Sequence, residues 1–318
     1  MGVCLFFAIS GYLVSHSLEK NHHLIRFYWF KFVHIVPPYI SSYLAISFLF
    51  MLLAFVRPDF LHQTPLSKVL FVGGDYKAFL IGLFPVDGYL NMYLHLPGYW
   101  FVGEWFIGTV VSLYLISPAL YIALRNGRSL VLPYSLLFLY VSICIYRYAS
   151  HWPVHVFWVC LVRLPEFYLG ILLHMYRKKV DRYERRLVWG CFFLMVVVGI
   201  IDMIVYSYPF IADRFIPPKP RSFLFTIPMI VVIFLGCQYL NRVFRLHTIN
   251  EYSKKTYAFM LIQHIMINTF MWSFEEQNLS KLGVLFSLLL VFGMTMYLSG
   301  KIVSAYKPIE DRLLHKNE

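Results

Sequence analysis

The amino-acid sequence predicts an all-α fold, a polytopic membrane helix bundle with about nine transmembrane helices. Of the 318 residues, 59% are apolar and 14% are charged, and the mean hydropathy is +0.64. A soluble domain carries about 25% charged and about 45–50% apolar residues. Apolar runs of roughly 20 residues, which is the length that crosses a bilayer, recur from one end of the chain to the other.

The predicted spans follow one another with short connections. We expect them at about residues 3–18, 37–56, 99–122, 130–148, 155–176, 187–207, 222–240, 254–274 and 282–304. A weaker apolar stretch at 66–84 contains Gly73, Gly74, Asp75 and Lys77, and it fits a further crossing, a re-entrant segment or a surface helix. Since no soluble domain, internal repeat or low-complexity linker interrupts this pattern, residues 1–318 are predicted to form a single membrane domain.

The charges between the spans predict the orientation. The connections at 19–36, 123–129, 177–186 and 241–255 and the C-terminal segment are basic, whereas the connection at 275–281 carries Glu275 and Glu276. Cytoplasmic loops are enriched in Lys and Arg. If 66–84 does not cross, all the basic segments lie on one side, with the N-terminus outside and the C-terminus in the cytoplasm. The same interpretation accounts for the net charge of +12 without a nucleic-acid partner.

Cysteine usage and motif content argue against several kinds of chemistry. The five cysteines are scattered singly in apolar surroundings and have no CxxC spacing, so they predict neither a disulfide framework nor a metal site. The sequence contains no phosphate-binding glycine loop, HExxH or GxSxG. We therefore expect no metal and no covalent serine mechanism.

The first connection, "SLEKNHHLIRFYWFKFVHIVPPYI", alternates basic and aromatic side chains. Arg26, Lys31 and His34 are interleaved with five aromatic residues. One interpretation is a cytoplasmic anchor with an interfacial aromatic belt. The other is a pocket for a phosphorylated cytosolic ligand, in which the cations contact phosphates and the aromatic faces contact a ring system.

Ionisable residues within predicted spans are further candidates, because charge is costly in lipid. Arg163 and Glu166 are three residues apart on one helix, which favours an ion pair that either fixes packing or serves a site. Glu104 lies near the outer end of its span, and His264 lies mid-span beside Gln263. A solvated position for the glutamate and a packing role for the histidine are the alternatives to catalysis.

Several segments together resemble the acyltransferase-3 family of integral-membrane acyltransferases, and they occur in that family's order. The segments are "GVCLFFAISGYLV", "FYWFKFVHIVPPY", "YWFVGEWF" with "SLYLISP", "RLPEFYLGILL" and "YSKKTYAFMLIQH". Each motif alone is weak, because Phe, Gly and Ser are common in membrane helices. Their order over about residues 2–304 makes the match specific.

The resemblance implies an enzyme that moves an acyl group, commonly acetyl, from cytosolic acyl-CoA to a hydroxyl of a sugar. The acceptor would belong to a surface polysaccharide or glycolipid, and the enzyme would lie in a bacterial inner membrane, in contact with its lipids. On this reading Arg26, Lys31 and His34 hold the acyl-CoA phosphates and Arg163 contacts the substrate. Glu104, Glu166 and His264 are the catalytic candidates.

The sequence departs from the family pattern in three places. His34 stands where the family usually has arginine, and Gln263 occupies the place of the late histidine, which here follows as His264. The family also has a helix before the Gly-Val-x-x-Phe-Phe segment, which carries the usual catalytic base and gives ten spans in total. The 318-residue sequence starts after the position of that helix in the family pattern. We therefore expect it to lack the usual base and to be inactive.

Two other functions remain open from the sequence. A transporter or flippase of a lipid-linked glycan would use the intramembrane charges to line its path, although no inverted repeat supports it. A truncated, non-catalytic remnant would keep the scaffold and lack the chemistry.

Overall fold

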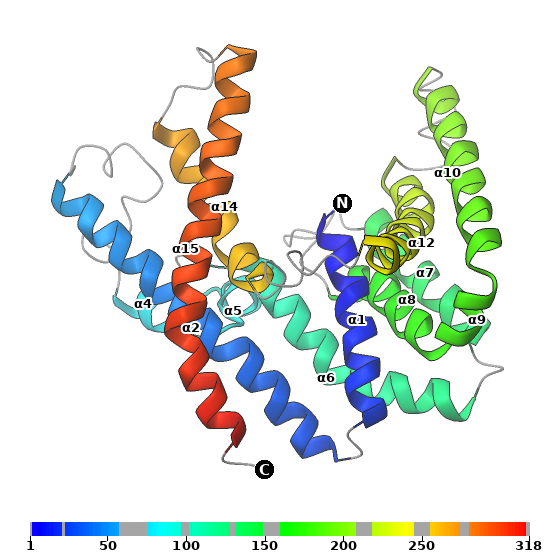
Figure 1. Cartoon of the computed structure of the whole chain (residues 1–318), viewed down its shortest axis with the longest axis horizontal. Helices are drawn as coiled ribbons and strands as arrows, with labels where there is room; N and C mark the ends of the chain where they lie inside the picture. Colours follow the sequence, from blue (N-terminus) through cyan, green and yellow to red (C-terminus); the bar gives the residue numbers. More distant parts are fainter. Residues whose placement is uncertain are drawn as a thin grey trace. The chain divides into compact units, whose positions relative to one another are not determined.

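A computed structural model of the chain describes residues 2–20, 23–56, 76–96, 102, 104–127, 131–148, 160–207, 218–244, 255–273 and 280–315. All regular secondary structure within these ranges is helical, and the chain is an all-α membrane helix bundle (Figure 1). Four described helices are long and apolar enough to cross a membrane: Gly2–Lys20, Leu24–Leu52, Phe106–Asn126 and Leu282–Leu314. The total of about nine crossings stays a prediction.

The helices divide between two compact units. Unit 1 comprises Met1–Phe27 and Ser112–Leu246, and unit 2 comprises Tyr28–Val111 and His247–Glu318. Two of the three boundaries fall within continuous helices, α2 (Leu24–Val56) and α6 (Glu104–Asn126). Each unit is described by itself below, and the single membrane domain stays a prediction.

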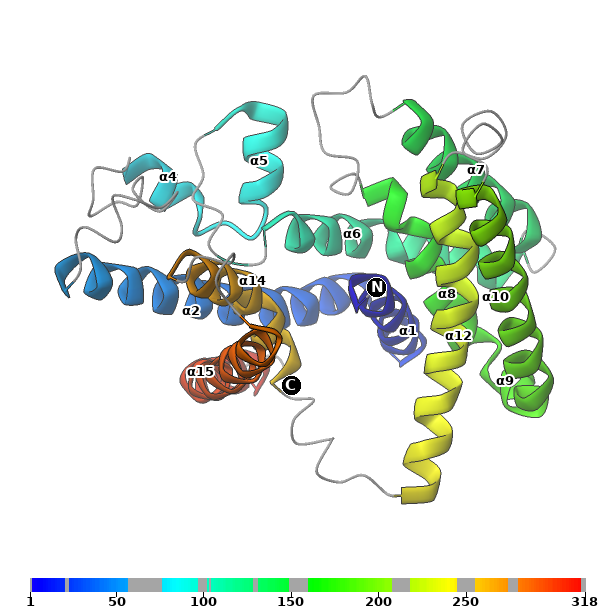
Figure 2. The same ribbon diagram turned by 90° about the horizontal axis from the view of Figure 1, so that it is seen from above.

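Unit 1 is built around a close contact between two helices. Its elements are α1 (Gly2–Lys20), the last part of α6, α7 (Val131–Tyr148), η6 (Cys160–Arg163), α8 (Leu164–Met175), α9 (Arg177–Arg182), α10 (Glu184–Ser207) and α12 (Pro218–Phe244). α1 packs along α8 and α10 packs along α12, as both ribbon views show (Figures 1 and 2).

Two glycines allow α1 and α8 to approach backbone to backbone. A Cβ added at Gly11 would collide with the carbonyl oxygen of Phe167, and one added at Gly170 would collide with the carbonyl oxygen of Ala8. Small residues at helix contacts are the usual device for close approach in membranes. In the sequence, Phe6, Phe7, Ser10 and Gly11 are typical of the close-packed part of a span; in the structure Phe7, Ser10 and Gly11 are buried and Phe6 is half-buried.

α1 and α8 run in the same direction. Cys4 contacts Arg163 at one end, Gly11 faces Phe167 in the middle, and Glu19 contacts His174 at the other end. Residue numbers rise together along both helices, so the pair is parallel.

Unit 2 contains the rest of α2, α4 (Tyr76–Ile81), α5 (Asp87–Leu94), the first part of α6, α14 (Thr256–Ser273) and α15 (Lys281–His315). Two tyrosines of α2 fasten the end of α4. Tyr39 Oη donates to the carbonyl of Gly82 at 2.8 Å, and Tyr43 Oη donates to that of Phe79 at 3.1 Å. These bonds satisfy carbonyls that the end of a helix leaves without helical partners.

α15 packs against α14 and against the first turns of α2. Trp29 Nε1 donates to the carbonyl of Leu313 at 3.4 Å, and His34 Nε2 lies 3.4 Å from Glu310 Oε1. Because the numbers fall along α15 as they rise along α2, these two helices are antiparallel.

The structure corrects the predicted connection at 19–36. From Leu24 onward this segment is helical, and α2 continues through Pro37 and Pro38, although a proline removes one helical hydrogen bond. The basic segment 177–186 is also mostly helical, as α9 and the start of α10. Of the weak stretch 66–84, residues 66–75 lie outside the described residues, and α4 is a helix of six residues.

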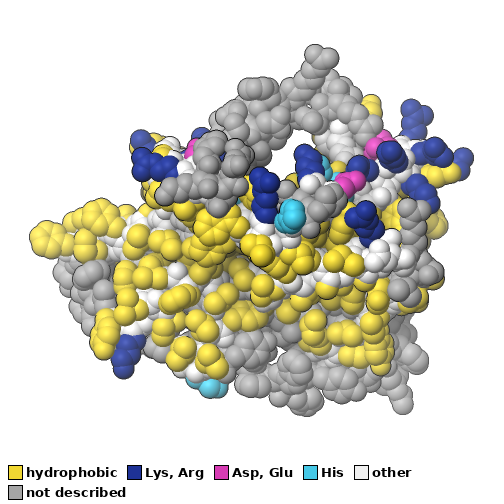
Figure 3. Space-filling view, turned by 90° about the horizontal axis from the view of Figure 1, so that it is seen from below, with side chains coloured by type: hydrophobic (Ala, Val, Ile, Leu, Met, Phe, Trp, Pro, Cys, Tyr) yellow, Lys and Arg dark blue, Asp and Glu magenta, His cyan; other side chains and the backbone are white. Residues whose placement is uncertain are grey.

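Much of the described surface is hydrophobic (Figure 3). On α15, for example, Leu282 is 76% exposed and Phe286 is 67% exposed. Contiguous apolar surface of this kind is expected where a helix faces lipid. All five cysteines are free, as their spacing predicts.

The glycine contact gives the first testable prediction. Gly170→Ala should lower the free energy of unfolding by about 1–3 kcal/mol, because the new Cβ meets backbone that cannot rotate away. Thermal denaturation in detergent measures the change. Gly199→Ala is the matched control, since a Cβ there meets nothing within 4 Å. Equal stability of the two variants would contradict the close approach.

Candidate functional site

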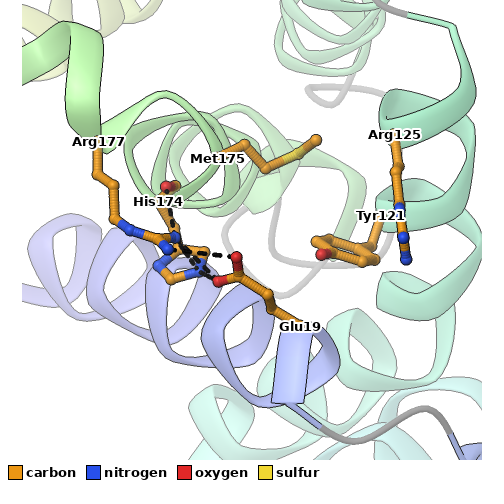
Figure 4. A pocket seen from close by; sticks show the side chains of 6 residues that line it. All are labelled: Glu19, Tyr121, Arg125, His174, Met175 and Arg177. Carbon is orange, nitrogen blue, oxygen red and sulfur yellow. Dashed lines mark hydrogen bonds and ion pairs between the residues drawn. The ribbon is translucent and has the colours of Figure 1, made fainter.

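Unit 1 contains an open pocket at the end of α1. It encloses about 200 Å³ and is lined by Glu19, Tyr121, Arg125, His174, Met175 and Arg177 (Figure 4). These residues come from three segments: the end of α1, the end of α6, and the junction of α8 with α9. Tyr121 and Arg125 face the pocket from α6, and Glu19 faces His174 and Arg177 (Figure 4).

Glu19 is the centre of a hydrogen-bonded group in this pocket. Arg177 donates two hydrogen bonds to its carboxylate, from Nη1 to Oε2 at 2.9 Å and from Nη2 to Oε1 at 3.2 Å. His174 Nε2 lies 2.8 Å from Oε2 of the same carboxylate. A two-point guanidinium contact is the geometry by which arginine recognises carboxylates and phosphates. The Glu19 carboxylate therefore occupies the place at Arg177 where an anionic ligand would bind.

The short contact fixes the proton on the buried imidazole. A carboxylate only accepts hydrogen bonds, so His174 Nε2 carries a hydrogen and donates it to Glu19. His174 is 2% exposed, and no described residue forms a hydrogen bond with its Nδ1. The rings of Tyr12 and His16 pack edge-on against it at 4.9 and 5.2 Å.

His16, Glu19 and His174 also bring three metal-ligating atoms within 4.8 Å of one another. Two imidazoles and a carboxylate are a donor set that zinc accepts. The sequence does not indicate this group, because 155 residues separate Glu19 from His174. Arg177 Nη1, however, lies 2.9 Å from Glu19 Oε2 and 3.1 Å from His174 Nε2. Its hydrogen bonds to Glu19 raise the pKa of Arg177 above its ordinary value, so a permanent positive charge there opposes a second cation.

Arg163 and Glu166 form the predicted ion pair, deep in unit 1. Arg163 Nη1 donates to Glu166 Oε1 at 3.2 Å and also contacts Cys4 Sγ at 3.4 Å. The arginine is 7% exposed and the glutamate 0%. The pair thus spans the start of α8 and reaches α1, which are the two helices of the glycine contact.

Lys31 and His34 lie on the same face of α2 in unit 2, three residues apart. His34 Nδ1 lies 2.7 Å from the carbonyl oxygen of Phe30, and Nε2 faces Glu310 Oε1 at 3.4 Å. Both neighbours are hydrogen-bond acceptors. Trp29 stacks on Phe32 nearby, with ring centroids 5.7 Å apart.

The remaining predicted site residues are Glu104, His264 and Arg26. Glu104 is the first residue of α6, and its side chain lies outside the described residues. His264 is on α14 in unit 2 with its side chain exposed, and Arg26 is exposed in the first turn of α2, in unit 1. The structure therefore brings Lys31 and His34 together, and Arg163 and Glu166 together.

Sequence reasoning missed the Glu19 cluster and Glu310. Two helical pairs three residues apart were the available signals, namely His16 with Glu19 and His174 with Arg177. Residues at this spacing share a helix face. Nothing in the spacing indicated that α1 and α8 would bring the two pairs together.

The comparison with protein families decides the broad class. The family described as an acyltransferase domain, acyltransferase-3, matches residues 1–302. The chain belongs to the acyltransferase-3 family. Comparison with curated proteins and with solved structures found no significant match. This acyltransferase-3 protein is therefore a multi-pass membrane acyltransferase in general terms.

The buried ion pair of this acyltransferase-3 protein gives the second prediction. Glu166→Gln should lower the free energy of unfolding by about 3–5 kcal/mol, because it leaves the Arg163 charge buried without its counter-ion. The double variant Arg163→Met with Glu166→Gln should recover most of that loss, since both charges are gone. Denaturant titration of the purified protein measures both. A double variant as unstable as the single one would contradict this account.

Proposed function

We propose that the protein is a membrane O-acyltransferase that transfers an acyl group, most simply acetyl, from acyl-CoA to a sugar hydroxyl. The acceptor is a polysaccharide or glycolipid of the cell surface, and the protein works in a bacterial inner membrane with its C-terminus in the cytoplasm. The observation that carries the proposal is the acyltransferase-3 match over residues 1–302.

Acyl-CoA offers phosphates and an adenine ring, and α2 presents suitable groups for both. Lys31 and His34 supply positive charge on one helix face, and the stacked rings of Trp29 and Phe32 adjoin them. Phe32 is 50% exposed, so it is accessible to a ligand. Arg26, which lies in unit 1, stays a predicted phosphate contact.

The direction of the donor site agrees with the predicted orientation. In unit 2, the basic start of α2 meets the basic end of α15 through the contact of His34 with Glu310. In unit 1, the ends of α1 and α6 meet the start of α9 around one pocket. All five of these segments belong to the side that the excess of Lys and Arg predicts to be cytoplasmic, where acyl-CoA is found.

The reaction needs a base that removes the hydroxyl proton, after which the alkoxide attacks the thioester carbonyl and the CoA thiolate leaves. Glu104, Glu166 and His264 are the proposed catalytic residues within the chain, and Arg163 is the proposed substrate contact. Glu166 is fully buried against α1, so a catalytic role for it requires α1 and α8 to separate locally.

Charge reversal at the donor site is the third prediction. Lys31→Glu combined with His34→Glu should weaken acyl-CoA binding by roughly a hundredfold, because two charge-assisted contacts are lost. Equilibrium binding of acetyl-CoA to the purified full chain measures the change. The milder pair Lys31→Gln with His34→Gln should weaken binding by roughly tenfold while disturbing the fold less.

Arg312→Glu is the matched control for this experiment. Arg312 is exposed in the last turns of α15, so its reversal removes positive charge from the neighbouring surface while Lys31 and His34 stay in place. Acetyl-CoA binding that falls equally in the control would contradict a specific site. A transporter would show no affinity for acetyl-CoA in the unaltered chain, which would contradict the proposed function itself.

A further inference from the structure

We infer that the pocket lined by Glu19, Tyr121, Arg125 and Arg177 is a binding site for a phosphate group; none of these residues belongs to the donor site proposed on α2. This inference goes beyond the proposed transfer reaction and does not depend on it. The phosphate belongs either to a soluble phosphate compound or to the headgroup of an anionic lipid, and the same side chains recognise it in both cases.

The positive charge of the pocket exceeds its negative charge. Arg125 and Arg177 contribute two guanidinium groups, and Glu19 contributes one carboxylate. Glu19 is already engaged by Arg177 through two hydrogen bonds. Within the described part of the chain, the Arg125 guanidinium and the Tyr121 hydroxyl take part in no hydrogen bond or ion pair. On one wall of the pocket, therefore, a guanidinium and a hydroxyl have no hydrogen-bond partner among the described residues (Figure 4).

Helix geometry puts these two donors on one face of α6. Tyr121 and Arg125 are four residues apart on α6, so their side chains lie one above the other on one face. Arg177 faces them from α9 across the pocket. A phosphate between the two arginines would accept from both guanidinium groups and from the tyrosine hydroxyl. Such charge-assisted bonds are the strongest that side chains form with phosphate.

The size and position of the pocket limit which ligands can bind there. Pockets that hold drug-sized molecules enclose about 300–1,000 Å³, whereas this one encloses about 200 Å³, which suits a single small group. It lies at the last turns of Gly2–Lys20 and Phe106–Asn126, two helices that are apolar and long enough to span a membrane. A headgroup at the membrane surface and a phosphate in solution can both reach that level.

Glu19 makes the inference unusually testable, because its carboxylate competes with the ligand for Arg177. A residue that merely held the helices together would weaken any site when altered. Removal of the competing charge by Glu19→Gln should instead strengthen phosphate binding, while Arg125→Gln should weaken it. The two substitutions therefore act in opposite directions only if the pocket binds an anion.

The experiment uses the full chain in nanodiscs of neutral phosphatidylcholine. In the first arm, inorganic pyrophosphate is titrated and its binding is measured by calorimetry. In the second arm, the discs contain phosphatidylglycerol, and the lipid retained by the protein is measured by native mass spectrometry. Arg125→Gln should reduce binding by roughly tenfold or more in the arm that represents the ligand, and Glu19→Gln should increase it.

Two matched controls separate the pocket from the general charge of the surface. Arg182→Gln removes one guanidinium from α9, and Asp181→Asn removes one carboxylate there, both outside the pocket lining. Neither should change binding. A thermal melt without ligand confirms that each variant is folded.

The outcomes decide the inference. Effects confined to the pyrophosphate arm assign the site to a soluble phosphate compound, and effects confined to the phosphatidylglycerol arm assign it to a lipid headgroup. Absence of binding in both arms would overturn the inference. So would equal losses in Arg125→Gln and Arg182→Gln, or weaker binding in Glu19→Gln. None of these outcomes depends on the acetyl-CoA titration that tests the proposed function.

Discussion

The backbone contact between α1 and α8 is the constraint on which the rest of unit 1 depends. Gly11 and Gly170 each face a carbonyl oxygen of the other helix, so the two axes are held closer than side chains would permit. Two polar groups of this unit lie along that contact. The Arg163–Glu166 pair and Cys4 lie at one end, and Glu19 with His174 lies at the other. A change in the helix spacing would therefore move both groups together.

The directions of packed helices give independent support for the predicted order of spans. Parallel neighbours need an odd number of crossings between them, and the spans predicted at 37–56, 99–122 and 130–148 separate α1 from α8. Antiparallel neighbours need an even number, and six predicted spans separate α2 from α15. The odd number agrees with the parallel pair α1 and α8 in unit 1, and the even number agrees with the antiparallel pair α2 and α15 in unit 2. The agreement is informative because the order was derived from hydropathy and loop charge alone.

Local composition predicted the helices well and the sites only in part. Hydropathy places the long helices but not the short α5 and α9. The i to i+3 spacing of Arg163 with Glu166 correctly predicts their ion pair. Residues 24–36 were misjudged as a connection, because basic side chains at the membrane boundary resemble a loop in composition although the backbone remains helical. Glu19 and Arg177 were beyond prediction because 158 residues separate them. Only the packing of two glycine-bearing helix faces brings them into contact, and pairing of that kind leaves no local signal.

Each basic cluster has a carboxylate of its own, and this has a consequence for binding. Glu19 engages Arg177 in unit 1, while Glu310 faces His34 and lies 3.2 Å from Lys307 in unit 2. Pairing lowers the cost of keeping cations at the edge of a low-dielectric layer. An arriving phosphate must then replace a carboxylate at the cation, so its affinity is the difference between two similar interactions. Such a difference favours rapid exchange, because the resident carboxylate returns to the cation as the ligand leaves. The proposed transfer reaction would benefit from that reversibility, because spent CoA would have to leave after every cycle.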